Sequence, residues 1–378
     1  MTGKLLRVSI VAAFMAVIAC SAVARAQAVP VPGPCTDGTL PGGAKSRICT
    51  PIAGWNHELV LFAHGYVRAD EPLQFANLTL PDGTSLPTLV QSLGYAFATT
   101  TYRQNGLAIL EGAADIQELV AAFDAAHGVP TKTYLTGASE GGLVTALLAE
   151  QPQARHVFSS ALATCGPIGS FQAQIDYFGD FRVLFDYYFP GILPPSAINV
   201  PQSVMANWYT QYVPSIVAAV TANPGAAVEL LRVAHAPYDP ANPPTVVQTI
   251  LDVLWYNVFA TNDATAKLGG NPYGNRFRWY FGSSNDLKLN LSVARYTESP
   301  VAAFALRPYE TTGLLRMPLV TLHTTRDDIV PFWQELLYYA KLDPFGRTQF
   351  TPLPVSRYGH CTFTTNELLA AFQVTITR

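Results

Sequence analysis

Three apolar runs and one short β-leaning run in the first half of the chain predict strands. They lie at residues 57–63, 94–102, 133–136 and 158–165. Continuous apolar runs of this length are typical of strands that are covered on both faces. Helical patterns at about 107–127 and 142–150 separate the last three runs. Strands that alternate with helices predict an α/β fold, with a mostly parallel, doubly wound sheet and helices on both faces.

The alternation stops between residues 167 and 315. This segment contains proline-punctuated helical pieces, and eleven aromatic residues fall between Phe171 and Tyr212, about 26% of that stretch against 11% of the whole chain. Strands and helices then resume, with apolar runs at 317–323 and 349–355 and helical patterns at 331–341 and after Thr364. We therefore expect a core made of residues 27–166 and 316–378, into which residues 167–315 are inserted as a large helical cap. Residues 27–54 are rich in Pro and Gly and predict an irregular leader.

The β-leaning run at 133–136 leads into Gly137-Ala-Ser-Glu-Gly141, and a helical pattern follows it. A G-x-S-x-G sequence between a strand and a helix is typical of a nucleophile elbow, where the serine occupies a strained turn. Side chains at Gly137 and Gly141 would collide with the neighbouring strand and helix. The turn exposes the hydroxyl of Ser139 at a helix N-terminus, where backbone N–H groups can stabilise an oxyanion. We predict that Ser139 is a catalytic nucleophile.

A serine nucleophile needs a base that takes its proton and an acid that orients the base. His360 follows the last predicted strand and precedes the last predicted helix, so its loop can reach across the strand ends. Asp327 and Asp328 follow the strand before that. We assign the base to His360 and the acid to Asp327. Asp328 is the alternative acid, or it caps the helix that Pro331 begins.

Two backbone amides are candidates for stabilising the oxyanion. The N–H of Glu140 comes directly after the nucleophile, and the N–H of Tyr66 lies in the loop after the first predicted strand. Gly65 allows a tight turn in that loop. His64 precedes Ser139 in the chain and fits a structural brace for the loop better than the catalytic base. We predict that the amides of Tyr66 and Glu140 form the oxyanion hole.

The first 26 residues have the pattern of a secretion signal. Lys4 and Arg7 precede an apolar run from Val8 to Ala19. Ala24-Arg-Ala26 offers a cleavage site, and Ala26-Gln-Ala28 offers a second one. The apolar run is too short to span a bilayer comfortably, so we expect no stable membrane span. An alternative is a lipid anchor, because the residues before Cys20 resemble a lipobox. We expect a secreted or periplasmic protein, or one that is lipid-anchored outside the cytoplasm.

The charge of the chain gives no indication of a polyanionic partner. The 378 residues carry a net charge of −3, and loss of residues 1–26 would leave about −6. A weakly acidic chain does not favour nucleic acid or an anionic membrane surface as a partner. No C-x-x-C pair or His/Cys cluster has metal-ligand spacing, so we expect no metal and no cofactor.

Four cysteines remain when Cys20 is set aside, an even number that suits an oxidising compartment. Cys35 and Cys49 lie within the leader and flank a Gly/Pro-rich loop of it, and a bond between them would close a ring of 15 residues. On the chain-entropy model such a ring contributes roughly 3 kcal/mol. This pairing leaves Cys165 with Cys361.

Four motifs resemble those of the α/β-hydrolase superfamily over residues 57–166 and 313–370. The resemblance implies a core of about eight strands and hydrolysis through a covalent acyl-enzyme, and the chain order of Ser139, Asp327 and His360 is the order of that superfamily. His360-Cys361 is also similar to the tannase and feruloyl esterase group, where a cysteine beside the histidine is disulfide-linked to one beside the serine. The chain departs from that pattern because Ala138 precedes Ser139. The motifs are Gly137-Ala-Ser-Glu-Gly141, Ala63-His-Gly-Tyr66, Asp327-Asp-Ile-Val-Pro331 and Gly359-His-Cys361.

These features predict a secreted serine hydrolase that cleaves carboxylic esters of small molecules or polymers. Aromatic residues of the cap are candidates for an apolar pocket, since such sites are mostly hydrophobic. Aromatics at helical spacing also form hydrophobic cores, which is the alternative interpretation. The candidate pocket residues are Tyr177, Phe178, Phe181, Tyr187, Tyr188 and Trp208.

Two other functions remain open. The same catalytic groups cleave amides, and sequence does not separate the two substrates because the difference lies in pocket shape. An aminopeptidase would need a carboxylate clamp for the substrate amine, for which Asp176, Asp180 and Asp186 are candidates. The second alternative is a catalytically silent fold used for binding, and the presence of all three catalytic residue types argues against it.

Overall fold

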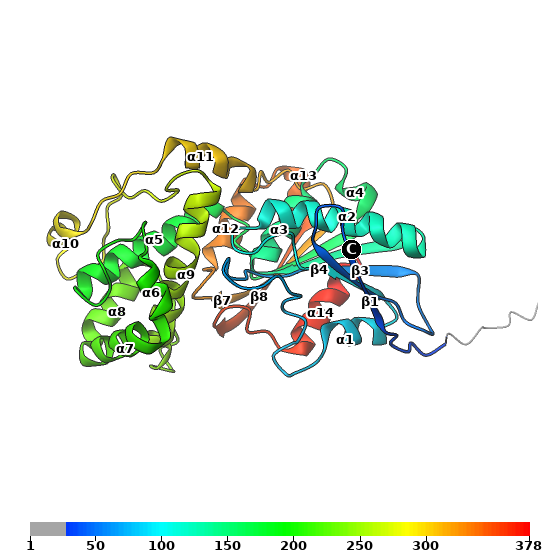
Figure 1. Cartoon of the computed structure of the whole chain (residues 1–378), viewed down its shortest axis with the longest axis horizontal. Helices are drawn as coiled ribbons and strands as arrows, with labels where there is room; N and C mark the ends of the chain where they lie inside the picture. Colours follow the sequence, from blue (N-terminus) through cyan, green and yellow to red (C-terminus); the bar gives the residue numbers. More distant parts are fainter. Residues whose placement is uncertain (1–27) are drawn as a thin grey trace, which may run out of the picture.

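Eight strands form one sheet in the order β1-β2-β4-β3-β5-β6-β7-β8 (Figure 1). The computed structural model describes residues 28–378, so the predicted secretion signal and Cys20 lie outside the described residues. The strands from β4 to β8 are parallel to their neighbours, and β1 and β2 add to the edge in antiparallel pairs. The strands are β1 (Cys35–Thr39), β2 (Lys45–Cys49), β3 (Glu58–Ala63), β4 (Ala96–Thr100), β5 (Lys132–Ala138), β6 (Ser160–Thr164), β7 (Leu319–Arg326) and β8 (Phe350–Tyr358).

Helices cover both faces of this sheet. Leu59 and Leu61 of β3 point to one face, where they belong to the same apolar core as Ile116 of α2 and Leu143 of α3. Val60 and Phe62 point to the other face and belong to a core closed by α1 and α14. Successive side chains of β3 point to opposite faces of the sheet, so this strand contributes to both cores. The helices of the core are α1 (Leu86–Ser92), α2 (Ile109–His127), α3 (Glu140–Ala149), α4 (Ala154–Val157), α12 (Trp333–Lys341), α13 (Pro344–Gln349) and α14 (Thr365–Ile376).

The prediction that residues 27–54 are irregular is partly wrong, because β1 and β2 form a hairpin within this segment. All five residues of β1 are exposed, so the strand carries no apolar alternation that the sequence could display. The hairpin is held by the disulfide between Cys35 and Cys49, one of the two expected pairings. The second strand of the hairpin, β2, pairs with β4. The hairpin therefore extends the sheet by two strands.

Between β6 and β7 the chain runs through residues 171–309, which we call the inserted helices. They have a hydrophobic core of their own, built around residues such as Phe181, Phe185 and Trp208. In Figure 1 most of them gather at one end of the molecule, away from β1 and β3. The elements are α5 (Phe171–Tyr188), α6 (Gln202–Ala206), the π-helix η1 (Trp208–Tyr212), α7 (Val213–Ala222), α8 (Pro224–Val233), α9 (Thr245–Lys267), α10 (Asp286–Ser292), α11 (Pro300–Leu306) and the 3-10 helix η2 (Arg307–Tyr309).

Within residues 28–378, no single helix is long and apolar enough to cross a membrane. One bent pair, Trp208–Ala222 with Pro224–Val233, meets the length and composition criteria only when its two parts are taken together.

Candidate active site

Ser139 occupies a strained turn between β5 and α3. Its backbone has φ 55° and ψ −120°, a conformation that costs energy for a residue with a side chain. The glycines around it are required by close backbone contacts. A Cβ at Gly137 would collide with the carbonyl oxygen of Gly141, and a Cβ at Gly141 would collide with that of Ala63. The turn is thus compressed against β3 on one side and α3 on the other.

The structure brings Ser139, His360 and Asp327 into one hydrogen-bonded chain. His360 Nε2 lies 2.9 Å from Ser139 Oγ, and His360 Nδ1 lies 2.8 Å from Asp327 Oδ2. A carboxylate only accepts, so Nδ1 carries a proton and donates it to Asp327. In the neutral imidazole Nε2 is then free to accept the hydroxyl proton of Ser139. The three side chains come from turns and loops at the carboxyl ends of β5, β7 and β8.

Asp327 is fully buried and held ionised by its neighbours. Its Oδ1 accepts hydrogen bonds from the backbone N–H groups of Ile329 (3.0 Å) and Val330 (2.8 Å). Burial alone would raise the pKa of Asp327, but His360 and His323 outweigh it and hold this pKa well below its usual range. The carboxylate is therefore fixed in both charge and orientation.

Asp328, the alternative acid, does not contact His360. Its carboxylate accepts a hydrogen bond from Tyr358 Oη at 3.1 Å, and its backbone carbonyl accepts one from Tyr177 Oη at 2.7 Å. It does not cap the following helix, since residue 332 occupies the N-cap position of α12. Burial and the nearby carboxylate of Asp252 raise the pKa of Asp328.

His323 is a site residue that the sequence analysis did not identify. Its Nε2 lies 2.7 Å from the carbonyl oxygen of Val330 and 3.4 Å from Asp327 Oδ2, and its Nδ1 lies 3.1 Å from Glu335 Oε1. Both ring nitrogens face acceptors, so the ring is doubly protonated. Burial opposes this charge, but hydrogen bonds to Asp327 and Glu335 raise the pKa of His323 to about 10. The sequence contained one indication of this role, because His323 ends the predicted strand at 317–323 and precedes Asp327 by four residues.

The loop after β3 lies directly against Ser139. A Cβ added to Gly65 would come within 3.2 Å of Ser139 Cβ, and the N–H of Gly65 donates to Asn77 Oδ1 at 3.0 Å. Within residues 28–378 the N–H groups of Tyr66 and Glu140 have no hydrogen-bond acceptor. Two unpaired donors beside a serine hydroxyl form a site at which an oxyanion could bind.

His64 packs inside the same loop. Its ring stacks on Tyr102 with centroids 3.9 Å apart, and its Nδ1 donates to the carbonyl oxygen of Gly65 at 2.7 Å. Burial lowers the pKa of His64, so its ring is neutral. These contacts are those of a brace for the loop.

The carboxyl group of Glu140 is buried next to the nucleophile. Its Oε1 accepts a hydrogen bond from the N–H of Ala108 at 3.0 Å. Burial raises the pKa of Glu140 to about 8, against the smaller opposing effects of this hydrogen bond and of Lys267. The carboxyl group of Glu140 is therefore mostly protonated and uncharged at neutral pH.

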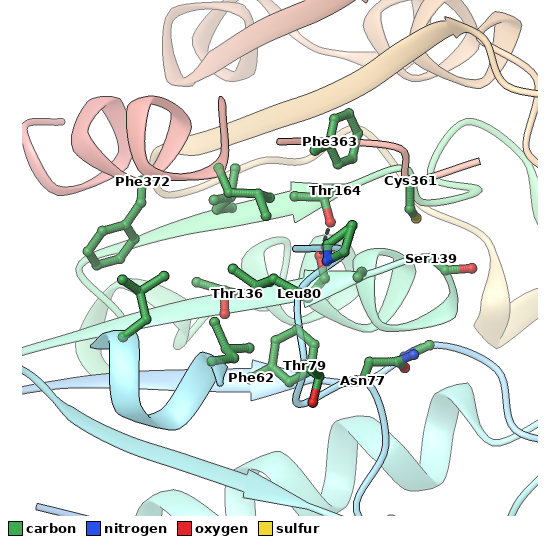
Figure 2. A pocket seen from close by; sticks show the side chains of 18 of the residues that line it. Phe62, Asn77, Thr79, Leu80, Thr136, Ser139, Thr164, Cys361, Phe363 and Phe372 are labelled. Atoms are coloured by element: carbon green, nitrogen blue, oxygen red, sulfur yellow. Dashed lines mark hydrogen bonds between the residues drawn. The ribbon is translucent and has the colours of Figure 1, made fainter. Parts of the chain in front are cut away.

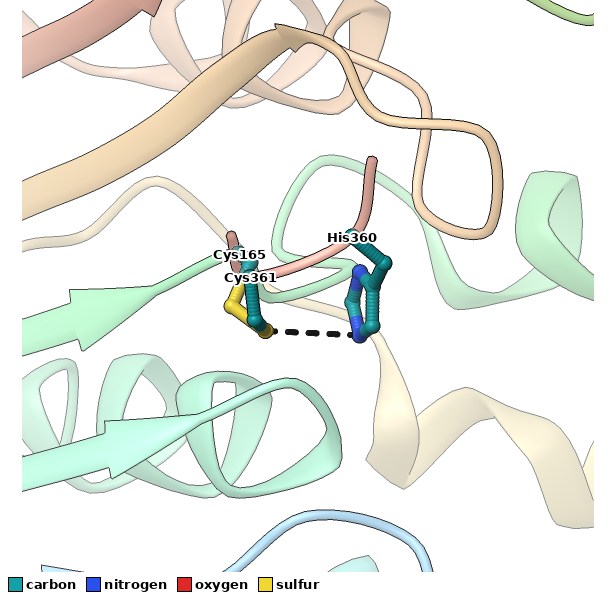
Figure 3. A group of neighbouring side chains, drawn as sticks. All are labelled: Cys165, His360 and Cys361. Atoms are coloured by element: carbon teal, nitrogen blue, oxygen red, sulfur yellow. Dashed lines mark hydrogen bonds between the residues drawn. A yellow bond between two sulfur atoms is a disulfide. The ribbon is translucent and has the colours of Figure 1, made fainter. Parts of the chain in front are cut away.

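The second expected disulfide, between Cys165 and Cys361, adjoins His360 (Figure 3). It ties the loop after β8 to the end of β6, and Cys361 Sγ lies 3.4 Å from His360 Nε2. The three residues lie close enough for their ligand atoms to hold a metal ion. However, the two sulfurs are bonded to each other, so neither is a thiolate that could bind zinc. The pair therefore positions the histidine loop and offers no metal site.

Two cavities meet at Ser139. The larger chamber has a volume of about 350 Å³ and lies between the sheet and the helices α1 and α14 (Figure 2). The smaller chamber has a volume of about 100 Å³ and lies between the core and the inserted helices. Tyr66 and Tyr256 line both chambers, His360 lines the larger one and Glu140 the smaller one.

The structure does not gather the six candidate pocket aromatics around Ser139. Phe178 alone of the six lines a chamber, the smaller one, where it stacks on Tyr256 with centroids 5.1 Å apart. The other five do not line either chamber, because the inserted helices use them to fill and flank their own core. They are Tyr177, Phe181 and Trp208, which are buried, and Tyr187 and Tyr188, which are half-buried.

The three aspartates considered as an amine clamp also lie elsewhere. Asp176 and Asp180 pair with Arg278, and Asp186 pairs with Arg182 at 2.9 Å. None of the three lines either chamber. Their charges are compensated within the inserted helices.

No family model and no curated protein matches the sequence of this chain. Among solved structures, feruloyl esterase B from Aspergillus oryzae aligns over 86% of this chain and 74% of its own, with a TM-score of 0.52 and 14% identity. The chain has the α/β-hydrolase fold. This confirms the predicted fold, including its eight strands.

Two further solved structures align with lower scores. An esterase from Pyrococcus furiosus covers 90% of both chains with a TM-score of 0.45 and 10% identity. An acylaminoacyl peptidase in complex with Z-Gly-Gly-Phe-chloromethyl ketone covers 91% of this chain, with a TM-score of 0.45 and 13% identity. The present chain spans only 40% of the length of that peptidase. At such identities the similarity concerns the fold alone.

Proposed function

We propose that the protein is an extracytoplasmic serine hydrolase that cleaves carboxylic esters. The observation that carries this proposal is the hydrogen-bonded chain from Asp327 through His360 to Ser139, which ends on a serine in a strained turn. The two disulfides indicate the extracytoplasmic location, because such bonds persist in oxidising compartments.

The geometry supports a two-step acyl transfer. His360 Nε2 takes the proton of Ser139 as Oγ attacks the acyl carbon, and the N–H groups of Tyr66 and Glu140 stabilise the oxyanion. Collapse of this intermediate breaks the bond to the alcohol, which leaves with the proton held by His360. Water then attacks the acyl-enzyme in the same manner and releases the acid. Each oxyanion donor typically contributes about 3 kcal/mol, and all steps use protein groups and water.

The electrostatics near Ser139 favour an ester over a substrate with a free amine. An aminopeptidase needs a fixed negative charge close to the nucleophile. Asp176, Asp180 and Asp186 are paired with arginines away from the chambers. Glu140 lines the smaller chamber, but burial raises the pKa of this carboxyl to about 8. A substrate ammonium would therefore meet an uncharged wall at neutral pH.

We further propose that residues 1–26 direct secretion and are then removed. N-terminal sequencing of the protein recovered from outside the cytoplasm tests this proposal. A new N-terminus at Gln27 is expected from cleavage after Ala26. A lipid-modified Cys20 at the N-terminus would replace simple secretion by an anchor.

The test of the activity is hydrolysis of nitrophenyl esters and of peptide anilides by three proteins. We expect ester turnover by the wild type and a loss of kcat of at least about ten-thousandfold in Ser139→Ala. Ser203→Ala, at an exposed position of α6, is the control and should keep full activity. Anilide cleavage with weak ester turnover would identify a peptidase instead. Equal rates in the wild type and Ser139→Ala would reject a catalytic role for Ser139.

A further inference from the structure

The larger chamber extends from Ser139 along one face of the sheet. Its floor is formed by β3, β5 and β6, and its walls are formed by α1, α14 and the loop before α1. In Figure 2 Ser139 lies at one end of the drawn lining and Phe372 of α14 at the other. A group that enters beside the nucleophile can therefore extend away from it between the sheet and these two helices.

The wall of this chamber is apolar and leucine-rich, and it also contains Phe62, Phe363 and Phe372. Leucines come from the loop before α1, from α1 and its C-terminal end, from β6 and from α14. They are Leu80, Leu86, Leu89, Leu93, Leu162, Leu368 and Leu369.

The polar side chains of the sheet face are already paired with the protein. Thr136 Oγ1 donates to the carbonyl oxygen of Leu61 at 2.7 Å, and Thr164 Oγ1 donates to that of Gly137 at 3.1 Å. A phenolic hydroxyl that passes Asn77 and Thr79 and lies among the leucines would lose its water and meet only threonine hydroxyls that already donate to backbone carbonyls. Such an unpaired group costs about 1–3 kcal/mol in proteins. The leucine-lined part of the chamber is therefore less suited to a hydroxylated aromatic acid than to an alkyl chain.

We propose that the larger chamber binds a flexible aliphatic chain of an ester substrate, and that the smaller chamber binds the compact remainder. The proposal rests on the proposed function. A volume of about 350 Å³ holds on the order of ten groups of water or methylene size, at about 30 Å³ each. The smaller chamber, at about 100 Å³, holds only a few such groups. The substrate class is esters with an unbranched chain of about ten carbons, in preference to phenolic esters such as ferulates.

Chain-length profiles test this inference directly. One arm uses nitrophenyl alkanoates from acetate to tetradecanoate, which place the chain on the acyl side, and the other uses alkyl acetates, which place it on the alcohol side. In one of the two arms kcat/KM should rise about threefold to fourfold per methylene until the chamber is filled. Methyl ferulate and methyl gallate should be at least about a hundredfold poorer than the best aliphatic ester. Flat profiles in both arms, or a preference for the phenolic esters, would overturn the proposal.

A pair of tryptophan substitutions on α1 tests the chamber, one inside it and one on the exposed face of the same helix. Leu89→Trp places a large side chain in the chamber, and Thr88→Trp places the same side chain on the exposed face of α1. Leu89→Trp should lower kcat/KM for the ten-carbon ester at least tenfold more than it lowers kcat/KM for the acetate, whereas Thr88→Trp should alter neither. If Leu89→Trp does not fold, Leu369→Trp and the exposed Ala370→Trp repeat the comparison on α14. An unchanged chain-length optimum in the folded chamber variant would contradict the assignment.

A binding measurement separates this inference from the proposed function. Calorimetric titration of decanoate into Ser139→Ala requires no catalysis. Binding that Leu89→Trp weakens at least tenfold would support the chamber even if no ester were hydrolysed. Absence of decanoate binding, together with Ser139-dependent hydrolysis of acetate esters, would overturn the chamber and keep the proposed function.

Discussion

The sheet core and the inserted helices differ in what their most conspicuous residues do. In the core, the residues that follow β3, β5, β7 and β8 converge on one point, where Ser139, His360 and Asp327 are in contact. In the inserted helices, the most aromatic segment of the chain mainly fills its own interior. Of the aromatic side chains in that segment, Phe171 and Phe178 line the smaller chamber, together with Tyr256 of α9.

The physical reason lies in how each region buries its apolar surface. Parallel strands end at the same edge of a sheet, so polar residues just beyond those ends are brought together by the fold itself. The inserted helices lie apart from most of the sheet and must form a second core from their own side chains. Position relative to a strand end therefore indicated chemistry, whereas aromatic enrichment indicated packing.

The largest expected effect separates two adjacent core aspartates. Asp327→Asn should lower kcat by about a thousandfold to ten-thousandfold, because the amide no longer fixes the charge and tautomer of His360. Asp328→Asn changes a neighbouring side chain that does not contact His360, and we expect a loss of less than about tenfold. Steady-state kinetics of both variants at neutral pH check the difference. Equal losses in the two variants would break the distinction between the site and its surroundings.

A second comparison concerns two kinds of aromatic residue in the inserted helices: those that fill their hydrophobic core and those that line a chamber. Trp208 is 1% exposed, and Trp208→Ala should lower the free energy of unfolding by about 3–5 kcal/mol. The kcat/KM of the remaining folded protein should change less than about threefold. Phe178→Ala should cost less stability and raise KM, since Phe178 lines the smaller chamber. Urea unfolding and ester kinetics measure both, and a substrate-selectivity change in Trp208→Ala would count against this division.

The smallest expected effect concerns the pH dependence of stability. Glu335 and Asp327 raise the pKa of His323 to about 10 from its ordinary 6.5. The protonated ring therefore stabilises the folded state fully below pH 6.5, and this contribution is lost as the pH rises through about 10. Glu335→Gln removes one partner, so its unfolding free energy should fall less than that of the wild type between neutral and alkaline pH. The expected difference is on the order of 1 kcal/mol.

Urea unfolding at about pH 7 and about pH 9.5 measures this difference. Comparing the two proteins cancels other groups that titrate in the same window, such as Glu140. Parallel pH dependence in wild type and Glu335→Gln would show that His323 is not held protonated by Glu335.

Much of the core was predictable from sequence because its signals are local. The strands β3 to β8 appear as apolar runs, and the elbow glycines, Asp327 and His360 stand at recognisable positions after them. The strands β1 and β2 were missed because β1 is exposed along its whole length. Its place in the sheet depends on pairing with β2 and on the Cys35–Cys49 bond, neither of which alters the apolar pattern.

The parts of the site that sequence could not supply depend on packing between distant elements. The larger chamber is formed where α1 and α14, almost 300 residues apart, meet the same face of the sheet. His323 could be read only as one of several histidines, because its role depends on Asp327 and Glu335 on either side of the ring. Tyr256 of α9 lines both chambers but lies in an unremarkable helical pattern.

The central claim is that Ser139 is the nucleophile activated through His360. Reaction of the protein with a decyl fluorophosphonate, followed by peptide mapping, tests it most directly, because an activated serine displaces fluoride and keeps the phosphonyl group. A single adduct on Ser139, absent from Ser139→Ala and strongly slowed in His360→Ala, is the predicted result. An adduct on another residue, or labelling of Ser139 at the same rate in His360→Ala, would contradict the claim.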